Sequence, residues 1–125
     1  MAQHVHSYAG AAGNPVKFCH GFGIFQYDIQ FCGNDPDFFL QRQWTDFSTC
    51  LSKALRELDN ARTRAYGPNK DTLTDTEAVY VAIAYNQGHV DIHGSLKQGF
   101  KQDDGRFYGE LMAGYLAMAQ GVPLQ

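Results

Sequence analysis

The sequence predicts an all-α fold, and three observations support this prediction. Apolar residues recur at steps of three and four from Leu40 to Ala61, which is the spacing of an amphipathic helix. A helix-start signal, Thr74-Asp75-Thr76-Glu77, precedes the uncharged run Ala78–Tyr85. A third apolar-periodic stretch lies within residues 105–120. We therefore expect a set of helices preceded by a glycine-rich segment.

That glycine-rich segment, residues 1–35, is predicted to be loop with a short hairpin or helical turn. The long helix after it should begin at Pro36, because proline suits a first helical turn, with Asp35 as its N-cap. The sequence Tyr66-Gly67-Pro68-Asn69 is expected to end it. Its inner face would carry the periodic residues Leu40, Trp44, Phe47, Leu51, Leu55, Leu58 and Ala61.

Two further helices are predicted in the second half of the chain. Thr74 and Glu77 form a capping box at the start of the first, and Gly88 can supply the left-handed residue that ends it. The near absence of charge in this helix predicts burial on almost all sides. Residues 89–104 are expected to be loop. The last helix would run from about Gly105 to Gln120, with an inner face of Phe107, Leu111, Met112, Tyr115, Leu116 and Met118.

Length, charge and composition narrow the function classes. The chain has 125 residues, which fits a single domain over 1–125, and a net charge of −3. Its ten lysines and arginines are scattered, so we expect no nucleic-acid partner. No apolar run is long enough for a membrane span, and the N-terminus has no signal-peptide pattern, which leaves the localisation unknown. No motif indicates a cofactor.

The cysteines and histidines do not form a recognisable metal or disulfide pattern. Cys19, Cys32 and Cys50 are irregularly spaced, so buried free thiols are expected, with a Cys19–Cys32 bridge as the alternative in an exported protein. His89 and His93 are four residues apart and would share one face of a helix, as zinc ligands do. Glycines bracket this pair and argue against a helix there, and the pair His4 and His6 stands alone. We therefore predict no metal site.

The segment GFGIFQYD, residues 21–28, combines glycines, aromatic rings and polar groups. Gly21 and Gly23 permit backbone conformations closed to other residues, and the rings beside them offer flat apolar surfaces. Gln26 and Asp28 add an amide and a carboxylate. Flat rings next to such groups suit the binding of sugars. The competing interpretation is that the rings are core residues and the glycines ordinary turns.

Three motifs in this chain resemble those of goose-type lysozymes and their lytic transglycosylase relatives. GFGIFQYD is similar to the family segment Gly-Phe-Gly-Leu-Met-Gln-x-Asp, and Ala84–Gly88 is similar to Ala-Tyr-Asn-x-Gly. Arg106–Glu110, before an apolar helix, is similar to the tyrosine-bearing last helix of the family. The motifs occur in the family order across residues 21–118. The resemblance implies a lysozyme-like helical fold and a groove for β-1,4-linked N-acetylated glycan, such as peptidoglycan or chitin.

The resemblance also implies roles for individual residues. Asp28 would match the carboxylate that positions water, and is the candidate catalytic residue. Gln26 and Tyr27 would line the groove. Tyr85 and Asn86 would lie beside the cleaved bond, and Tyr108 would be a further sugar contact.

The chain departs from the family at the proton donor. The family uses a glutamate shortly before the glycine-rich segment, where this chain has His6, and the glutamates here, Glu57, Glu77 and Glu110, all lie downstream. Glu77 is expected in its capping box and Glu57 on a solvated helix face. A glycosidase needs an acid held in its neutral form, and His6 is a conceivable replacement.

Two main hypotheses follow from this departure. The chain is a truncated form of a peptidoglycan glycoside hydrolase or lytic transglycosylase, or it is a non-catalytic helical module that binds glycan or a protein partner. In the second case an exposed apolar patch would favour a homo-oligomer. A chance similarity of an unrelated helical domain is the third interpretation.

Overall fold

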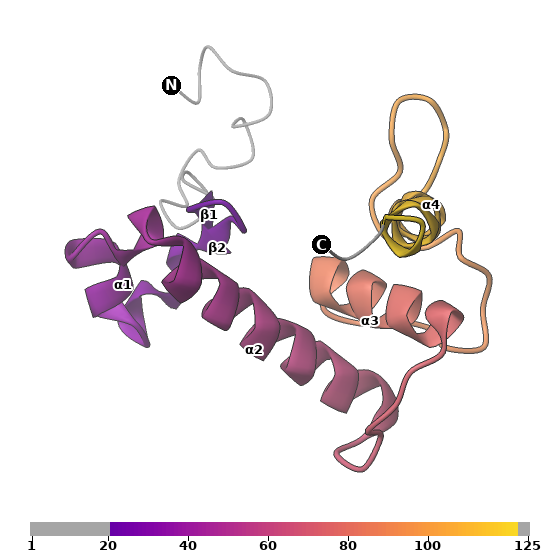
Figure 1. Cartoon of the computed structure of the whole chain (residues 1–125), viewed down its shortest axis with the longest axis horizontal. Coiled ribbons are helices and arrows are strands. Elements are labelled where there is room, and N and C mark those ends of the chain that lie inside the picture. The colour runs from indigo at the N-terminus through magenta and orange to yellow at the C-terminus, as the bar shows by residue number, and fades with distance from the viewer. Residues whose placement is uncertain (1–20, 123–125) are drawn as a thin grey trace, which may run out of the picture. The chain divides into compact units, whose positions relative to one another are not determined.

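The computed structural model describes residues 21–122 and is mostly helical (Figure 1). This confirms the all-α class in its coarse form, while the lysozyme-like identity stays a prediction. The elements are, in chain order, β1 (Gly21–Phe22), β2 (Tyr27–Asp28), the 3-10 helix η3 (Ile29–Gly33), α1 (Pro36–Leu40), the 3-10 helix η4 (Gln43–Thr45), α2 (Phe47–Tyr66), α3 (Asp75–Gln87) and α4 (Tyr108–Gln120). The described residues group into two compact units divided between Leu55 and Arg56, within α2.

The first unit contains the hairpin expected near its glycines. Strands β1 and β2 pair antiparallel, with Gly21 opposite Asp28. Gly23 and Gln26 both have positive φ, 74° and 55°, and the Gln26 N–H donates to the Gly23 carbonyl at 3.1 Å. A Cβ at Gly21 would lie 2.1 Å from the Gln26 carbonyl oxygen, so no side chain fits there. The glycines are therefore required by this turn.

An aromatic cluster forms the core of the first unit. Phe38 is fully buried, and its ring centroid lies 5.1 Å from those of both Tyr27 and Phe39. The cluster extends outward from these two rings, with Phe31 on Tyr27, Phe22 on Phe39 and Trp44 on Phe22. The Lys53 ammonium lies 4.9 Å from the centre of the Phe38 ring and pairs with Asp35. This position gives the ammonium both a ring face and a counter-charge.

The single long helix predicted from Pro36 is wrong, because the structure breaks it into three pieces. Helix α1 ends at Leu40, Arg42 adopts a left-handed conformation with φ 53°, and α2 begins only at Phe47. Asp46 caps the new start by accepting the Thr49 N–H at 2.7 Å.

Two further expectations for this stretch are corrected. Asp35 occupies the N-cap position of α1, but its side chain makes no capping bond and pairs with Lys53 instead. Three residues assigned to the inner face, Leu40, Phe47 and Leu55, are more than half exposed. Leu40 is the last residue of α1, and the buried stripe of α2 runs through Cys50, Ala54 and Ala61, which leaves positions 47 and 55 on its outer side.

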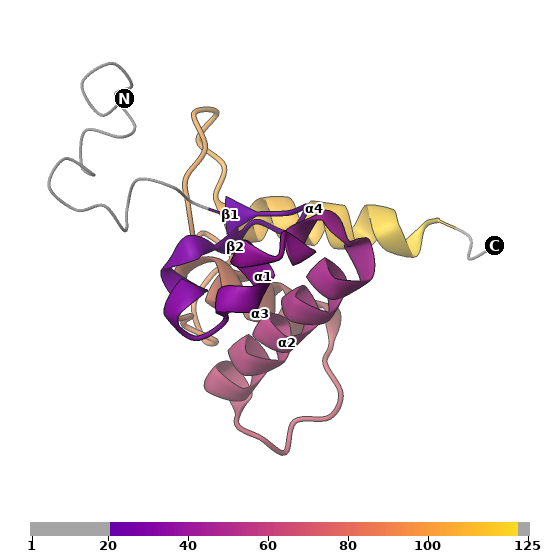
Figure 2. The same ribbon diagram turned by 90° about the vertical axis from the view of Figure 1, so that its left-hand side faces the viewer.

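Helix α3 is the centre of the second unit. Its residues Val79–Ala84 are buried in succession, as the low charge of the run predicts. One side packs on Leu58 and Ala61 of α2, and another on α4. Figure 1 shows α4 end-on where α3 lies in the plane of view, and Figure 2 shows α4 along its length, so these helices cross steeply. At the crossing, a Cβ on Gly109 would lie 2.4 Å from the backbone carbonyl oxygen of Leu96 and 2.6 Å from Ile83 Cδ1, and the close backbone contact makes glycine necessary here.

Both ends of α3 follow the prediction. The Glu77 N–H donates to Thr74 Oγ1, and the Thr74 N–H donates to the Glu77 carboxylate at 2.8 Å, which completes the capping box. Gly88 ends the helix with φ 85°, and its N–H donates to the Ala84 carbonyl.

The last helix differs in part from its prediction. It begins at Tyr108 rather than near Gly105, and Met112 and Leu116 pack on α3 as expected. Tyr115 and Met118, also assigned to the inner face, are 56% and 61% exposed. The reason is that Tyr108, Met112 and Leu116 recur every fourth residue, and this narrower stripe excludes positions 115 and 118.

The described cysteines are free thiols. Cys50 is buried, and its thiol donates to the Trp44 carbonyl at 3.3 Å, while Cys32 is half-buried. Cys19 lies outside the described residues. Between residues 21 and 122, no helix has the length and apolar character needed to cross a membrane.

Candidate functional site

The predicted site residues fall into two groups of three. Gln26, Tyr27 and Asp28 belong to the hairpin of the first unit, and Tyr85, Asn86 and Tyr108 belong to the second. His6 lies outside the described residues.

The hairpin group presents one exposed side chain. Gln26 is exposed, and its side-chain amide donates to the Gly23 carbonyl at 2.9 Å, which holds the turn. Tyr27 packs into the aromatic cluster, stacked on Phe31 at 5.2 Å and on Phe39 at 5.8 Å. Asp28 is half-buried at the end of β2. The first unit therefore uses Tyr27 for packing and offers Gln26 to solvent.

The other three predicted residues meet at the C-terminal end of α3, and we call Tyr85, Asn86 and Tyr108 the α3-end cluster. Tyr85 and Asn86 directly follow the last buried residue of α3, and Tyr108 is the first residue of α4. Gly99 lies between Asn86 and Tyr108, because a Cβ built on it would be 2.8 Å from Tyr108 Cβ and 3.5 Å from Asn86 Oδ1. Gly99 has φ 82°, a conformation that favours glycine. Residues from two separate motifs are thus brought together around this glycine.

Burial and nearby negative charge raise the pKa values of the two tyrosines in the α3-end cluster. Burial raises the pKa of Tyr85, and the negative charge of Glu57 raises it further. The pKa of Tyr108 is raised by burial and then by Tyr85. Because an unperturbed tyrosine already titrates near pH ~10, both hydroxyls stay protonated at neutral pH and can donate hydrogen bonds.

Glu57 is a functional candidate that sequence reasoning missed. It was expected on a solvated face, yet its side chain is only 25% exposed. Its negative charge lies near enough to Tyr85 to raise the pKa of that tyrosine. Its contacts with neighbouring side chains are long, 3.6 Å to Arg56 and 3.4 Å to Asn60. The approach of Glu57 to Tyr85 depends on the packing of α2 against α3, which no local pattern reveals.

The other two glutamates hold helix starts. Glu77 sits in the capping box of α3 and pairs with Lys70 at 2.7 Å. Glu110 accepts the Phe107 N–H at 2.9 Å at the start of α4. Glu57 is therefore the glutamate that remains outside a helix cap.

The polar groups of the α3-end cluster have unused hydrogen-bonding capacity. The Tyr85 and Tyr108 hydroxyls and the Asn86 side-chain amide make no hydrogen bond to any residue of the described range. Tyr85 and Asn86 are exposed residues, and the hydroxyl of the half-buried Tyr108 reaches solvent. Two hydroxyls and one amide provide both donors and acceptors to a ligand.

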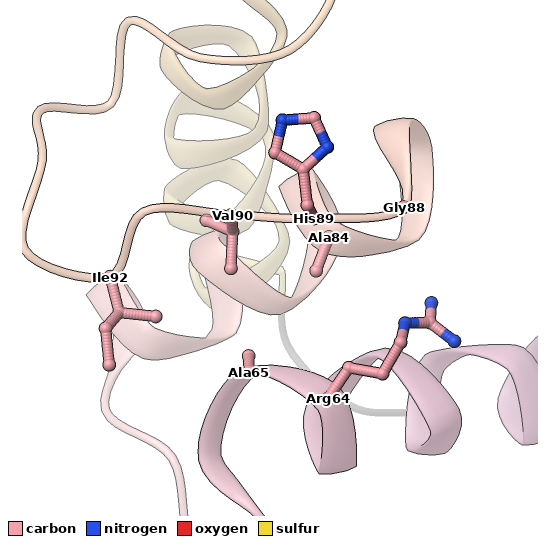
Figure 3. A pocket seen from close by; sticks show the side chains of 7 residues that line it. All are labelled: Arg64, Ala65, Ala84, Gly88, His89, Val90 and Ile92. Atoms are coloured by element: carbon pink, nitrogen blue, oxygen red, sulfur yellow. The ribbon is translucent and has the colours of Figure 1, made fainter.

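A small pocket lies elsewhere in the second unit (Figure 3). Its volume is about 200 Å³, and it is lined by Arg64, Ala65, Ala84, Gly88, His89, Val90 and Ile92. Figure 3 shows Val90 and Ala84 directed toward Ala65, so the floor is apolar. This volume is below the ~300–1,000 Å³ of typical ligand sites, and none of the predicted sugar-binding residues lines the pocket.

The described residues hold no group of three or more histidine, cysteine or acidic side chains placed to bind a metal ion. The segment of His89 and His93 is a loop, as its glycines predict, and the His93 N–H donates to Asp91 Oδ1 at 3.0 Å. His4 and His6 lie outside the described range.

Comparisons of the chain with family models, with curated proteins and with solved structures find no match. The resemblance to goose-type lysozymes and lytic transglycosylases rests on the three sequence motifs, and it stays a prediction.

Proposed function

We propose that the chain binds β-1,4-linked N-acetylated glycan, with peptidoglycan as the first candidate, through Tyr85, Asn86 and Tyr108. One observation carries the proposal. Two of the three motifs behind the resemblance are separated by a long loop, and they place Asn86 and Tyr108 on either side of Gly99, with Tyr85 near enough to Tyr108 to raise its pKa. This is what a shared ligand site requires, whereas a chance similarity gives no reason for the motifs to meet.

The chemistry of the α3-end cluster suits such a glycan. An N-acetylated sugar carries an amide, which needs both a donor and an acceptor, and hydroxyls that need the same. The Asn86 amide and the two protonated hydroxyls supply these groups, and the Tyr85 ring, in a residue 36% exposed, supplies flat apolar surface. Neutral tyrosines also avoid placing a negative charge against the sugar oxygens.

Glycosidic cleavage is the finer part of the proposal. It needs an acid that protonates the leaving oxygen and, in a hydrolase, a carboxylate that directs water. We propose Asp28 for the second role and Gln26 as a glycan contact. A non-catalytic glycan-binding module is the second candidate, and the engagement of Glu77 and Glu110 in helix caps favours it.

The test combines binding and cleavage on purified peptidoglycan. The unmodified chain is expected to sediment with peptidoglycan, and Asn86→Ala is expected to weaken binding about tenfold, the loss of one to two hydrogen bonds. Asn69→Ala, at an exposed loop position, is the matched control and is expected to bind normally.

Each outcome has a distinct meaning. No binding to peptidoglycan or chitin would overturn the proposed function. Equal binding by Asn86→Ala and Asn69→Ala would show that the site is wrong. Release of muropeptides would identify a glycosidase, and binding without release would identify the module.

A further inference from the structure

Phe100 is an aromatic residue that the predicted site does not use, and its ring is unusually open. It is 64% exposed, and within the described part of the chain its ring neither pairs with another aromatic ring nor faces a cation. Leaving a phenylalanine side chain in water forgoes the stabilisation that burying it would give. The Phe100 side chain therefore contributes much less to the stability of the fold than a buried phenylalanine would.

The backbone at Phe100 is fixed although the ring is open. The Phe100 carbonyl accepts the Tyr108 N–H at 2.9 Å, and the next residue, Lys101, forms a bridge with Phe107. On the other side Gly99 is held in its left-handed conformation against Tyr108. A ring on a fixed backbone loses little conformational entropy when a ligand covers it.

The neighbours of Phe100 suggest what would cover it. It directly follows Gly99, which lies against Tyr108 and Asn86, and its own carbonyl accepts the Tyr108 N–H. An exposed aromatic residue that adjoins polar groups with unused hydrogen-bonding capacity matches a ligand with one apolar face and polar edges. A pyranose ring in the β-gluco configuration has this form, because its substituents are equatorial and its C–H bonds point to the two faces.

We propose that Phe100 is a stacking platform for one N-acetylglucosamine-type ring of the bound glycan. This inference rests on the proposed function, and it adds a specificity. An axial hydroxyl at carbon 4 would obstruct one face of the ring. A galacto-configured ring therefore has one face left for stacking where a gluco-configured ring has two, and we expect the platform to bind the gluco configuration more tightly.

The test uses the full chain and tetra-N-acetylchitotetraose as the probe, with affinities from calorimetry. Phe100→Ala is expected to weaken binding about three- to tenfold, the range of an aromatic stacking contact. Phe100→Trp, which keeps a flat ring, is expected to bind at least as well as the unmodified chain. Tyr115→Ala removes another exposed ring of the same unit and is the matched control, with unchanged affinity expected.

A spectroscopic readout separates stacking from a structural effect. Ring currents should move the C–H proton resonances of one bound sugar upfield, and this shift should vanish in Phe100→Ala and persist in Phe100→Trp. The N-acetylgalactosamine oligomer should bind more weakly than the probe, and this preference should shrink in Phe100→Ala.

Other outcomes overturn the inference in distinguishable ways. If the unmodified chain does not bind the probe, the proposed function fails, and the platform fails with it. If the chain binds and Phe100→Ala binds equally well, only the platform is wrong. Equal loss in Phe100→Ala and Phe100→Trp would overturn stacking. A change of oligomeric state in Phe100→Ala with unchanged sugar affinity would assign the ring to a contact between copies instead.

Discussion

The two units of the chain are stabilised in different ways. In the first, helix α1 has five residues and each strand has two, and the core is a cluster of aromatic rings around Phe38. In the second, α3 and α4 have thirteen residues each, and small and aliphatic side chains such as Ala61 and Ile83 pack between helices. Elements as short as those of the first unit depend on side-chain contacts, because isolated short helices and hairpins are marginal.

This difference also affects what each unit can present to a ligand. The ring of Tyr27 is used to pack the first unit, whereas the second unit packs well with alanines and valines and leaves Tyr85 and Phe100 open. Rings that maintain a core are poor candidates for binding, and rings that a core does not need are better ones.

The largest effect is expected in the aromatic core. Phe38→Ala should lower the free energy of unfolding of the first unit by about 3–5 kcal/mol, because it removes a fully buried ring and leaves a cavity. A urea titration followed by fluorescence of Trp44, the single tryptophan, reports on this unit. Phe47→Ala, at a ring 57% exposed, is the control and should change the midpoint far less. Similar losses in both variants would contradict a core centred on Phe38.

A comparable substitution in the second unit tests whether its core is separate. Ile83→Ala should cost about 2–5 kcal/mol and Ile83→Val about 0.5–1.5 kcal/mol. Amide hydrogen exchange across α3 and α4 would measure the loss, and Met118→Ala, 61% exposed, is the control. If the two units unfold separately, the Trp44 transition should keep its midpoint in Ile83→Ala. An equal shift of that transition would show that they unfold as one.

The smallest effect concerns acid stability. Hydrogen bonds from Lys70 and from the Thr74 backbone lower the pKa of Glu77 below its usual 4.5. A lowered folded-state pKa stabilises the protein above the unfolded pKa, and this contribution is lost as the pH falls through the lowered value. Stability of the second unit should therefore decline below about pH 4.5, the ordinary glutamate range.

Glu77→Gln keeps a residue that can complete the capping box but cannot titrate. In thermal melts between neutral pH and pH 3, the melting temperature of this variant should fall less at acid pH than that of the unmodified chain. Lys70→Met, which removes the leading cause of the shift, should also reduce the acid-dependent loss. If the melting temperatures of Glu77→Gln and of the unmodified chain fall equally at acid pH, the capping carboxylate does not contribute to the pH dependence of stability.

The features predicted correctly from the sequence are those determined by neighbours along the chain. The capping box of Thr74 and Glu77 spans four residues, and Gly88 ends the same helix by its own conformation. A short hairpin was one of the two alternatives expected within the glycine-rich residues 1–35, and the structure has one at residues 21–28. Each of these signals is local, so no knowledge of the rest of the fold was needed.

The missed features depend on tertiary contacts. The apolar spacing from Leu40 through Trp44 to Phe47 continues across the break at Arg42, and neither glycine nor proline marks it. For the candidate site, the sequence predicted Tyr85, Asn86 and Tyr108 as sugar contacts, and this role stays a prediction. The sequence could not anticipate Glu57 beside Tyr85 or the open ring of Phe100, because both follow from how segments pack.

The buried run of α3 has a consequence for misassembly. Val79–Ala84 contains β-branched and aromatic residues with no charge, proline or glycine, which is the composition of segments that form fibrils. In the folded chain its backbone bonds are closed within a helix and its side chains are covered. When the second unit opens, the same residues become available to pair with another chain. The neighbours Glu77 and Asn86-Gln87 then act as the polar residues that limit such pairing.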